Sequence, residues 1–192
     1  MNPFKYGALF LFILTMTACG DAEQESVASL NGEAERVSVI TDATSQTVQQ
    51  VLQSYYTLKD ALVASDSVKA VLQSKELAQK TDSINLSSLQ QKDEALYAAV
   101  KELPLTIKQA AIALGETKGL EAQRAIFETI SDNLYELIKT IKPTGIATYH
   151  QYCPMAFEDK GAYWLSDTSH IQNPYFGKKM LICGEVTDSL YY

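Results

Sequence analysis

The stretch "IFETISDNLYELIKTI", residues 126–141, indicates the fold of this chain more directly than any other part of it. Its apolar residues share one face of a predicted α-helix: Ile126, Ile130, Leu134, Leu137 and Ile141, with Phe127 and Ile138 widening the face. "KPTG", residues 142–145, then supplies a cation at the negative end of the helix dipole and a proline that cannot continue the helix. Such a helix needs partners to cover its apolar face.

Three further helices are predicted upstream. Apolar spacing of three and four predicts one from residue 41 to about residue 65, and Asp66 or Ser67 can cap a second that ends at "TDSIN", residues 81–85. A third is predicted over 86–114, with a kink or break at Pro104. Short connections favour an up-and-down four-helix bundle over 41–144. The apolar faces carry no carboxylate or histidine, so no cofactor is expected among the helices.

Composition limits the function. The chain has 192 residues, of which 46% are hydrophobic, which suits a single domain, predicted over 41–192. A formal charge of −7 and a pI near 4.8 argue against a nucleic-acid partner, because such a protein needs a basic face to displace counterions from the phosphates.

The N-terminus resembles a bacterial lipoprotein signal. Lys5 is followed by the apolar run at residues 7–16, and small residues then precede Cys19. Residues 1–18 are therefore predicted to be a signal peptide, Cys19 the lipidated first residue, and 19–40 a flexible acidic tether. The alternative is an ordinary secretory signal with Cys19 incidental. The lipoprotein would lie in the cell envelope, facing the periplasm or the surface of the outer membrane.

The segment 145–192 has a different composition. It is rich in aromatic residues, glycine and proline, which predicts a compact cap that is irregular or contains β-strands. It also contains both histidines and, apart from the predicted anchor, every cysteine and methionine of the predicted mature chain: His150, Cys153, Met155, His170, Met180 and Cys183.

A soft-metal site is one explanation for this concentration of sulfur. In an extended strand Cys153 and Met155 point to the same side, and Met180 and Cys183 can converge on one turn. Two thiolates with two thioethers favour Cu(I) or Ag(I) over Zn(II). His150 is a candidate extra or substitute ligand, and no organic cofactor is expected.

A disulfide is the other explanation. Cys153 and Cys183 could pair in an oxidising compartment and stabilise a loop-rich cap by roughly 3 kcal/mol. Met155 and Met180 would then fill gaps among aromatic rings. A mixed case is a dithiol that binds Cu(I) when reduced and closes when oxidised. The residues alone leave these alternatives open.

Enzyme chemistry is not expected. "LSDTSH", residues 165–170, contains a serine, an aspartate and a histidine, but a nucleophilic triad is recognised by its geometry and its oxyanion hole. Ser166, Asp167 and Ser169 are more typical of turns, where short polar side chains bond their own backbone.

Four motifs follow one another in the cap: Cys-Pro-Met at 153–155, Gly-Ala-Tyr-Trp-Leu-Ser at 161–166, Asn-Pro-Tyr-Phe-Gly at 173–177 and Met-Leu-Ile-Cys-Gly at 180–184. With residues 55–66 and 122–131 they resemble a family of periplasmic domains of unknown function, numbered 3347, from which Lys178 departs slightly. Relatives occur as lipoproteins and joined to the adaptor subunits of heavy-metal efflux pumps. The resemblance implies a lipoprotein that buffers Cu(I) or Ag(I) or delivers it to such a partner; the alternative is a structural or interaction module without metal.

Overall fold

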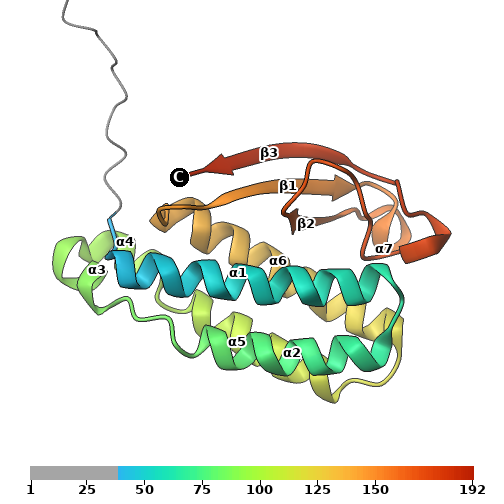
Figure 1. Ribbon diagram of the computed structural model, residues 1–192, viewed down its shortest axis with the longest axis horizontal. Coiled ribbons are helices and arrows are strands. Elements are labelled where there is room, and N and C mark those ends of the chain that lie inside the picture. Colours follow the sequence, from blue (N-terminus) through green and yellow to red (C-terminus); the bar gives the residue numbers. More distant parts are fainter. Residues whose placement is uncertain (1–38) are drawn as a thin grey trace, which may run out of the picture. The chain divides into compact units, whose positions relative to one another are not determined.

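The computed structural model describes residues 39–192, a mainly helical chain with a small three-stranded antiparallel sheet at its C-terminal end (Figure 1). This confirms the predicted helical part and strand-containing cap. The predicted signal peptide, Cys19 and almost all of the predicted tether lie outside the described residues. Ile40, at the end of that tether, is buried in the core. In the described range, no helix has the length and apolarity needed to cross a bilayer.

Four long helices build most of the core: α1 (Asp42–Val63), α2 (Ser67–Thr81), α5 (Leu103–Glu116) and α6 (Leu120–Ile141). Each packs on the next along the chain, α1 on α2, α2 on α5 and α5 on α6, whereas α1 and α6 touch much less. Two short helices, α3 (Ser87–Lys92) and α4 (Glu94–Val100), lie together at one end of the molecule (Figure 1). Within residues 39–192, six helices thus precede the sheet, and the simple four-helix bundle is not confirmed.

Capping residues explain where the helices begin. Asp66 caps α2, as predicted, because its carboxylate accepts a hydrogen bond from the backbone N–H of Lys69 at 2.9 Å. Pro104 lies in the first turn of α5, where its missing N–H costs nothing, so the predicted break is confirmed. A second break was not predicted: Asp93 ends α3 and caps α4 through the N–H of Leu96 at 3.0 Å.

The sheet has the order β2-β1-β3 and is antiparallel throughout. Its strands are β1 (Ala147–Cys153), β2 (Ala162–Ser166) and β3 (Glu185–Tyr191). The connections between them contain the single turn α7 (Ala156–Asp159) and the 3₁₀ turn η1 (Gly177–Lys179). On β1, His150 lies opposite Leu165 of β2 and Asp188 of β3, and the β1–β3 register shifts directly after His150.

A chain of hydrogen bonds joins the sheet to the helices. The backbone N–H of Leu165 donates to the Tyr55 hydroxyl at 3.0 Å, and that hydroxyl lies 2.7 Å from Ser131 Oγ. Ser131 in turn donates to the carbonyl of Phe127 at 2.9 Å. Because the hydroxyl hydrogen of Ser131 is already used, Tyr55 donates to Ser131. β2, α1 and α6 are thus held together through buried groups.

Arg124 of α6 makes a second connection to the cap. Its guanidinium is almost fully buried and donates to the carbonyls of Pro174, at 2.8 Å, and Leu62, at 3.1 Å. It also forms an ion pair with Glu121 at 2.9 Å. The loop that precedes η1 is therefore fixed to the end of α1 and to α6.

Candidate metal site

Cys153 and Cys183 come together in the folded chain. Cys153 ends β1 and is buried, whereas Cys183 lies just before β3 and is partly exposed; both are free thiols. Their side chains are hydrogen-bonding neighbours. Burial, together with the adjacent Cys153, raises the pKa of the Cys183 thiol to about 11, against an opposing effect of the Met155 backbone. The Cys183 thiol is therefore protonated at neutral pH.

The turn that carries Cys183 is held by Asn173, a buried residue of the preceding loop. The Asn173 side chain donates to the carbonyl of Cys183 at 2.9 Å, and its backbone N–H donates to the carbonyl of Leu181 at 2.8 Å. Its side-chain oxygen also accepts hydrogen bonds from the backbone of Tyr175 and Phe176. Asn173 opens the Asn-Pro-Tyr-Phe-Gly motif, but no local feature of the sequence indicates that it positions Cys183.

Gly184 lets this turn lie against the sheet. A Cβ atom built on Gly184 would lie 2.8 Å from the six-membered ring of Trp164 and 2.8 Å from the carbonyl oxygen of Tyr152. Any larger residue would push the turn away from β1. Trp164 itself is fully buried and belongs to the core of the cap.

The two methionines flank the thiols. Met155 follows β1, is 46% exposed, and has its backbone next to the Cys183 thiol. Met180 opens the turn that Cys183 closes, and its carbonyl accepts a hydrogen bond from the Cys183 N–H at 3.1 Å. The backbone segments that carry the four predicted sulfur ligands thus lie in one region of the cap.

His150 does not join them. Side chains of a strand alternate between its faces, and His150 lies three positions before Cys153, so the two side chains leave β1 on opposite faces. The His150 ring is stacked between Tyr135 of α6, at 3.7 Å between ring centroids, and Tyr163 of β2, at 4.6 Å. The structure therefore places this predicted extra ligand away from the thiols, and His170 is exposed in the loop after β2.

No three His, Cys, Asp or Glu side chains gather into a metal-binding group anywhere in residues 39–192. A zinc site usually needs at least three such ligands, and a structural one four. Two thiols with neighbouring thioethers instead match the donors that soft, monovalent ions prefer. The donor chemistry of the cap therefore fits Cu(I) or Ag(I) better than Zn(II).

Ser166 is buried and takes part in the turn that follows β2. Its hydroxyl oxygen accepts a hydrogen bond from the backbone of Thr168 at 3.3 Å and lies 3.5 Å from Lys59 Nζ. Lys59 is also buried and pairs with Asp167 at 3.3 Å. The His170 side chain makes no hydrogen bond to Ser166, so these residues form a turn and an ion pair rather than a triad.

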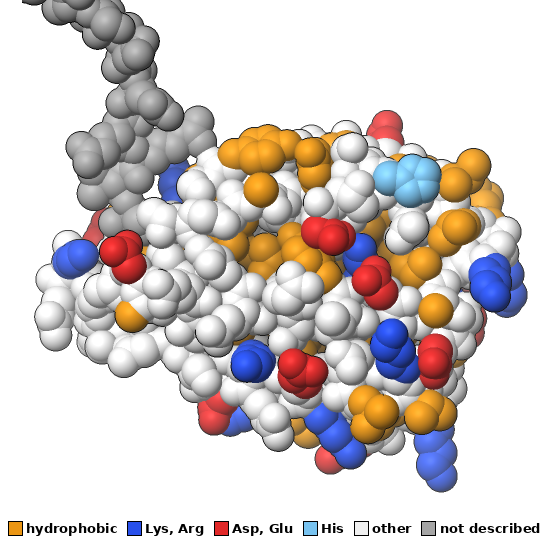
Figure 2. All heavy atoms as spheres, in the orientation of Figure 1, with side chains coloured by type: hydrophobic (Ala, Val, Ile, Leu, Met, Phe, Trp, Pro, Cys, Tyr) orange, Lys and Arg blue, Asp and Glu red, His pale blue; other side chains and the backbone are white. Residues whose placement is uncertain are grey.

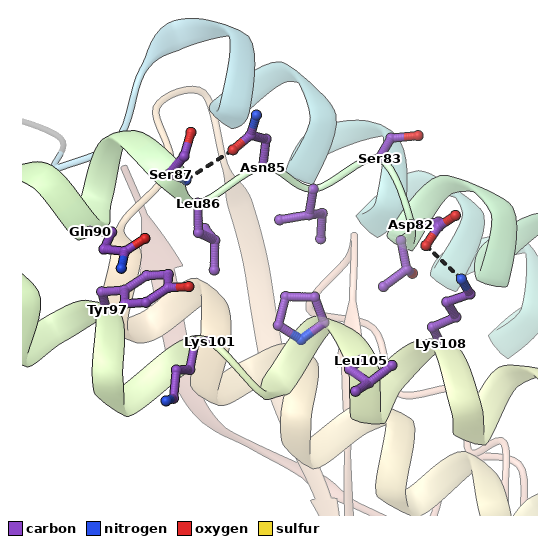
Figure 3. Close-up of a pocket in the computed structure, with 13 residues that line it drawn as sticks. Asp82, Ser83, Asn85, Leu86, Ser87, Gln90, Tyr97, Lys101, Leu105 and Lys108 are labelled. Atoms are coloured by element: carbon purple, nitrogen blue, oxygen red, sulfur yellow. Dashed lines mark hydrogen bonds and ion pairs between the residues drawn. The ribbon is translucent and has the colours of Figure 1, made fainter.

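A hollow of about 610 Å³ lies between the loop after α2 and the start of α5 (Figure 3). Two interactions join groups that line it: Asp82 pairs with Lys108, and the Asn85 side chain accepts a hydrogen bond from the backbone of Ser87. Acidic and basic side chains are interspersed on the face shown in Figure 2. Neither feature assembles reactive groups comparable with the two thiols.

The comparisons with known proteins give one match. The model of a family described as "Protein of unknown function (DUF3347)" matches residues 51–145, from the middle of α1 to the end of the helical part. No curated protein and no solved structure matches the chain significantly. The matched residues include the stretch 126–141, whereas the four motifs of the cap, at 153–184, lie outside the match. The chain therefore belongs to the DUF3347 family.

Proposed function

We propose that this protein is an extracytoplasmic lipoprotein that binds Cu(I) or Ag(I) through Cys153 and Cys183, with Met155 and Met180 as additional thioether donors. It would buffer the ion or pass it to an efflux system. The proximity of two free thiols from chain segments thirty positions apart carries the proposal. Soft ions prefer thiolate and thioether ligands to the carboxylates that are abundant elsewhere on the chain.

The two thiols differ in ways that suit reversible binding. Cys183 is partly exposed and offers a route from solvent, whereas Cys153 is buried and shielded from competing ligands. A metal ion binds the thiolate, so binding releases protons that the thiols hold at neutral pH. Met155, exposed beside Cys183, places a soft donor where an incoming ion first meets the protein.

The partners and location are part of the proposal. Cys19 would anchor the chain to the membrane through its lipid, and the acidic segment that follows would let the folded part reach a neighbour. An adaptor subunit of a heavy-metal efflux pump is the proposed recipient, on the resemblance of the cap motifs alone. Non-enzymatic metal exchange needs no further catalytic group.

The rival function is a structural or interaction module closed by a Cys153–Cys183 disulfide. The same proximity of the thiols favours it, because a small movement could bring the two sulfurs to bonding distance. An oxidised pair would leave no thiolate for a metal ion. The rival therefore predicts no free thiol in protein isolated without reductant.

A Cu(I) competition titration against a calibrated chromophoric chelator tests the proposal on the reduced chain from Gly20 to Tyr192. We expect the native chain to capture one equivalent of Cu(I). Cys183→Ser should weaken the Cu(I) affinity by about a hundredfold or more, because losing a direct ligand costs more than losing a group that only positions one. Met180→Leu should weaken it less, and His150→Phe should leave it unchanged. Leu105→Met, an exposed position on α5, is a control for added thioether. Capture that persists without Cys183, or no capture by the reduced native chain, would refute the proposal.

A further inference from the structure

A second hollow lies between α6 and the sheet, lined by residues that include Asp132, Glu136, His150 and Tyr163. We name it the His150 hollow. Its volume is about 610 Å³, and it opens broadly to solvent. Because His150 and Cys153 leave β1 on opposite faces, the hollow is separate from the proposed metal site.

Hydrogen bonding fixes which nitrogen of His150 carries the proton. The hydroxyl of Thr187 donates to the carbonyl of His150 at 3.1 Å and lies 3.3 Å from His150 Nδ1. Since its one hydrogen is used on the carbonyl, the hydroxyl can only accept from Nδ1–H. Thr187 is the residue of β3 that the β1–β3 register shift leaves without a partner on β1, and its hydroxyl lies beside Nδ1. The proton therefore belongs to Nδ1, and Nε2 presents a lone pair.

That lone pair has no partner. His150 is only 8% exposed, yet Nε2 makes no hydrogen bond within residues 39–192. Burial lowers the pKa of His150 to about 4, with Asp188 opposing and Lys139 reinforcing the shift, so the ring is neutral at pH 7. Nε2 is not among the fully buried atoms without a partner, so it keeps an accessible surface at the hollow. A ligand in the hollow can therefore donate a hydrogen bond to it.

The charges around the hollow favour a cation. Lys139 is already engaged, because it donates to the Tyr135 hydroxyl at 2.7 Å and pairs with Asp188 at 3.5 Å. Asp132 makes no hydrogen bond or ion pair in the described part of the chain; Lys160, which is paired with Glu128, acts on it only at longer range.

Glu136 lies one helical turn from Asp132 and accepts only from the hydroxyl of Thr140, at 3.3 Å. Two like charges at this spacing repel each other on a helix. A bound cation would relieve the repulsion and would meet the neutral imidazole at the same time.

We propose that the His150 hollow binds an alkylammonium or alkylguanidinium group, which donates an N–H to His150 Nε2 while the carboxylates of Asp132 and Glu136 supply the opposite charge beside it. A hard metal ion fits less well, because such ions take six or more oxygen ligands and no three ligating side chains gather within residues 39–192. The partly exposed Tyr163 ring offers a surface for the alkyl chain of the ligand. This binding activity is independent of the proposed metal site and goes beyond it.

Nitrogen NMR of the two histidine rings, recorded on the chain from Gly20 to Tyr192 at pH 7, tests the proposal. We expect the Nε2 signal of His150 to have the shift of an unprotonated ring nitrogen. It should move in a saturable way as n-butylammonium is added, with millimolar affinity typical of a small ligand. Trimethyl-n-butylammonium carries the same charge without N–H donors and should bind at least tenfold more weakly.

Variants separate specific binding from general charge attraction. His150→Phe keeps an aromatic ring in the stack but removes the lone pair. The double change Asp132→Asn with Glu136→Gln removes the negative charges. Each variant should weaken the binding of n-butylammonium at least fivefold. Glu76→Gln, a change at an exposed carboxylate on α2, should not. If both series fold, spermidine and an acetyl-Lys-Lys-Lys-amide peptide show whether a free polyamine or a protein side chain is the better source of the group. A protonated Nε2, an unresponsive His150 or equal binding of the quaternary ion would overturn the proposal.

Discussion

His150 shows how much a single residue's surroundings decide. Its ring lies between two tyrosine rings, one of its nitrogens is bonded to Thr187, and burial keeps it neutral. In the unfolded chain the same imidazole would be free to take up a proton near pH 6.5. The difference between the two states makes the stability of the fold sensitive to pH.

We predict that the free energy of unfolding falls as the pH is lowered from about 6.5 to about 4. In this window the unfolded state binds a proton at His150 that the folded state does not, because the folded pKa is about 4. The stabilisation is complete above pH 6.5, and its loss should reach about 2–3 kcal/mol at pH 4. Urea denaturation across this range measures it.

The matched comparison is between His150→Phe and His170→Gln. The first should flatten the pH dependence in this window, because no imidazole remains at position 150. The second changes the exposed histidine and should preserve the slope. An unchanged slope in His150→Phe would show that another group carries the dependence.

Backbone strain is concentrated in α7, directly after the Cys-Pro-Met motif. Phe157, Glu158 and Asp159 all have left-handed conformations, with φ of 53°, 58° and 67°. Such conformations cost roughly 1–2 kcal/mol for residues with a Cβ atom. The path of the chain from Met155 to β2 requires them.

We predict that Glu158→Gly stabilises the protein by up to about 1 kcal/mol, because glycine adopts this conformation freely and its flexibility in the unfolded chain offsets only part of the gain. Glu158 is exposed, so no packing is lost. Glu158→Ala keeps the Cβ atom and should give no comparable gain. A thermal unfolding series of the three proteins decides it, and stabilisation by both changes would argue against relief of strain.

At the scale of elements, the helices are connected to the sheet by a few buried polar groups. The hydrogen bonds run from the Leu165 N–H through Tyr55 and Ser131 to the Phe127 carbonyl, and so cross β2, α1 and α6. Each donor in this path has an acceptor, and each is buried. Removing one link leaves a buried group without a partner.

We predict that Tyr55→Phe lowers the free energy of unfolding by about 1–3 kcal/mol, the cost of leaving the buried Leu165 N–H unpaired. Tyr97→Phe removes a tyrosine hydroxyl that makes no hydrogen bond in the described range and should cost little. Amide hydrogen exchange at Leu165 should accelerate in the first variant only. An equal loss of stability in both variants would mean that the hydrogen bonds of the Tyr55 hydroxyl contribute nothing measurable to the free energy of unfolding.

The elements themselves were predictable where one local signal was strong. Apolar spacing located α1, α2 and α6, Asp66 marked the start of α2, and Pro104 marked the start of α5. The break at Asp93 was missed because the apolar pattern continues through it and predicts one uninterrupted helix. The Asp93 side chain instead caps a new helix, and tertiary packing decides between the two structures. The order β2-β1-β3 depends on long-range pairing that no local pattern encodes.

The site was predictable in composition but not in detail. Sulfur content identified Cys153 and Cys183 as a pair, and the structure places them in contact. Alternation along a strand separates His150 from Cys153, but the sequence could not show that β1 runs through both residues. Asn173 positions Cys183 from ten residues away through its side chain and backbone.

At the scale of the whole molecule, the helices support a small cap that exposes one side of a thiol pair. α6 and the end of α1 hold the loop of the cap through Arg124, and Asn173 fixes the turn that carries Cys183. The thiols therefore meet on a supported surface instead of in a flexible segment. Such support is what a site needs to bind a soft ion in one arrangement.

The central claim is that Cys153 and Cys183 bind Cu(I). X-ray absorption at the copper edge tests it most directly, on the reduced chain from Gly20 to Tyr192 loaded with less than one equivalent of Cu(I). We predict that copper is bound by sulfur alone, with no nitrogen from His150 in the first shell, and that Cys183→Ser removes sulfur from that shell. Copper surrounded by nitrogen or oxygen, or an unchanged sulfur shell in the variant, would contradict the assignment of the metal to this pair of thiols.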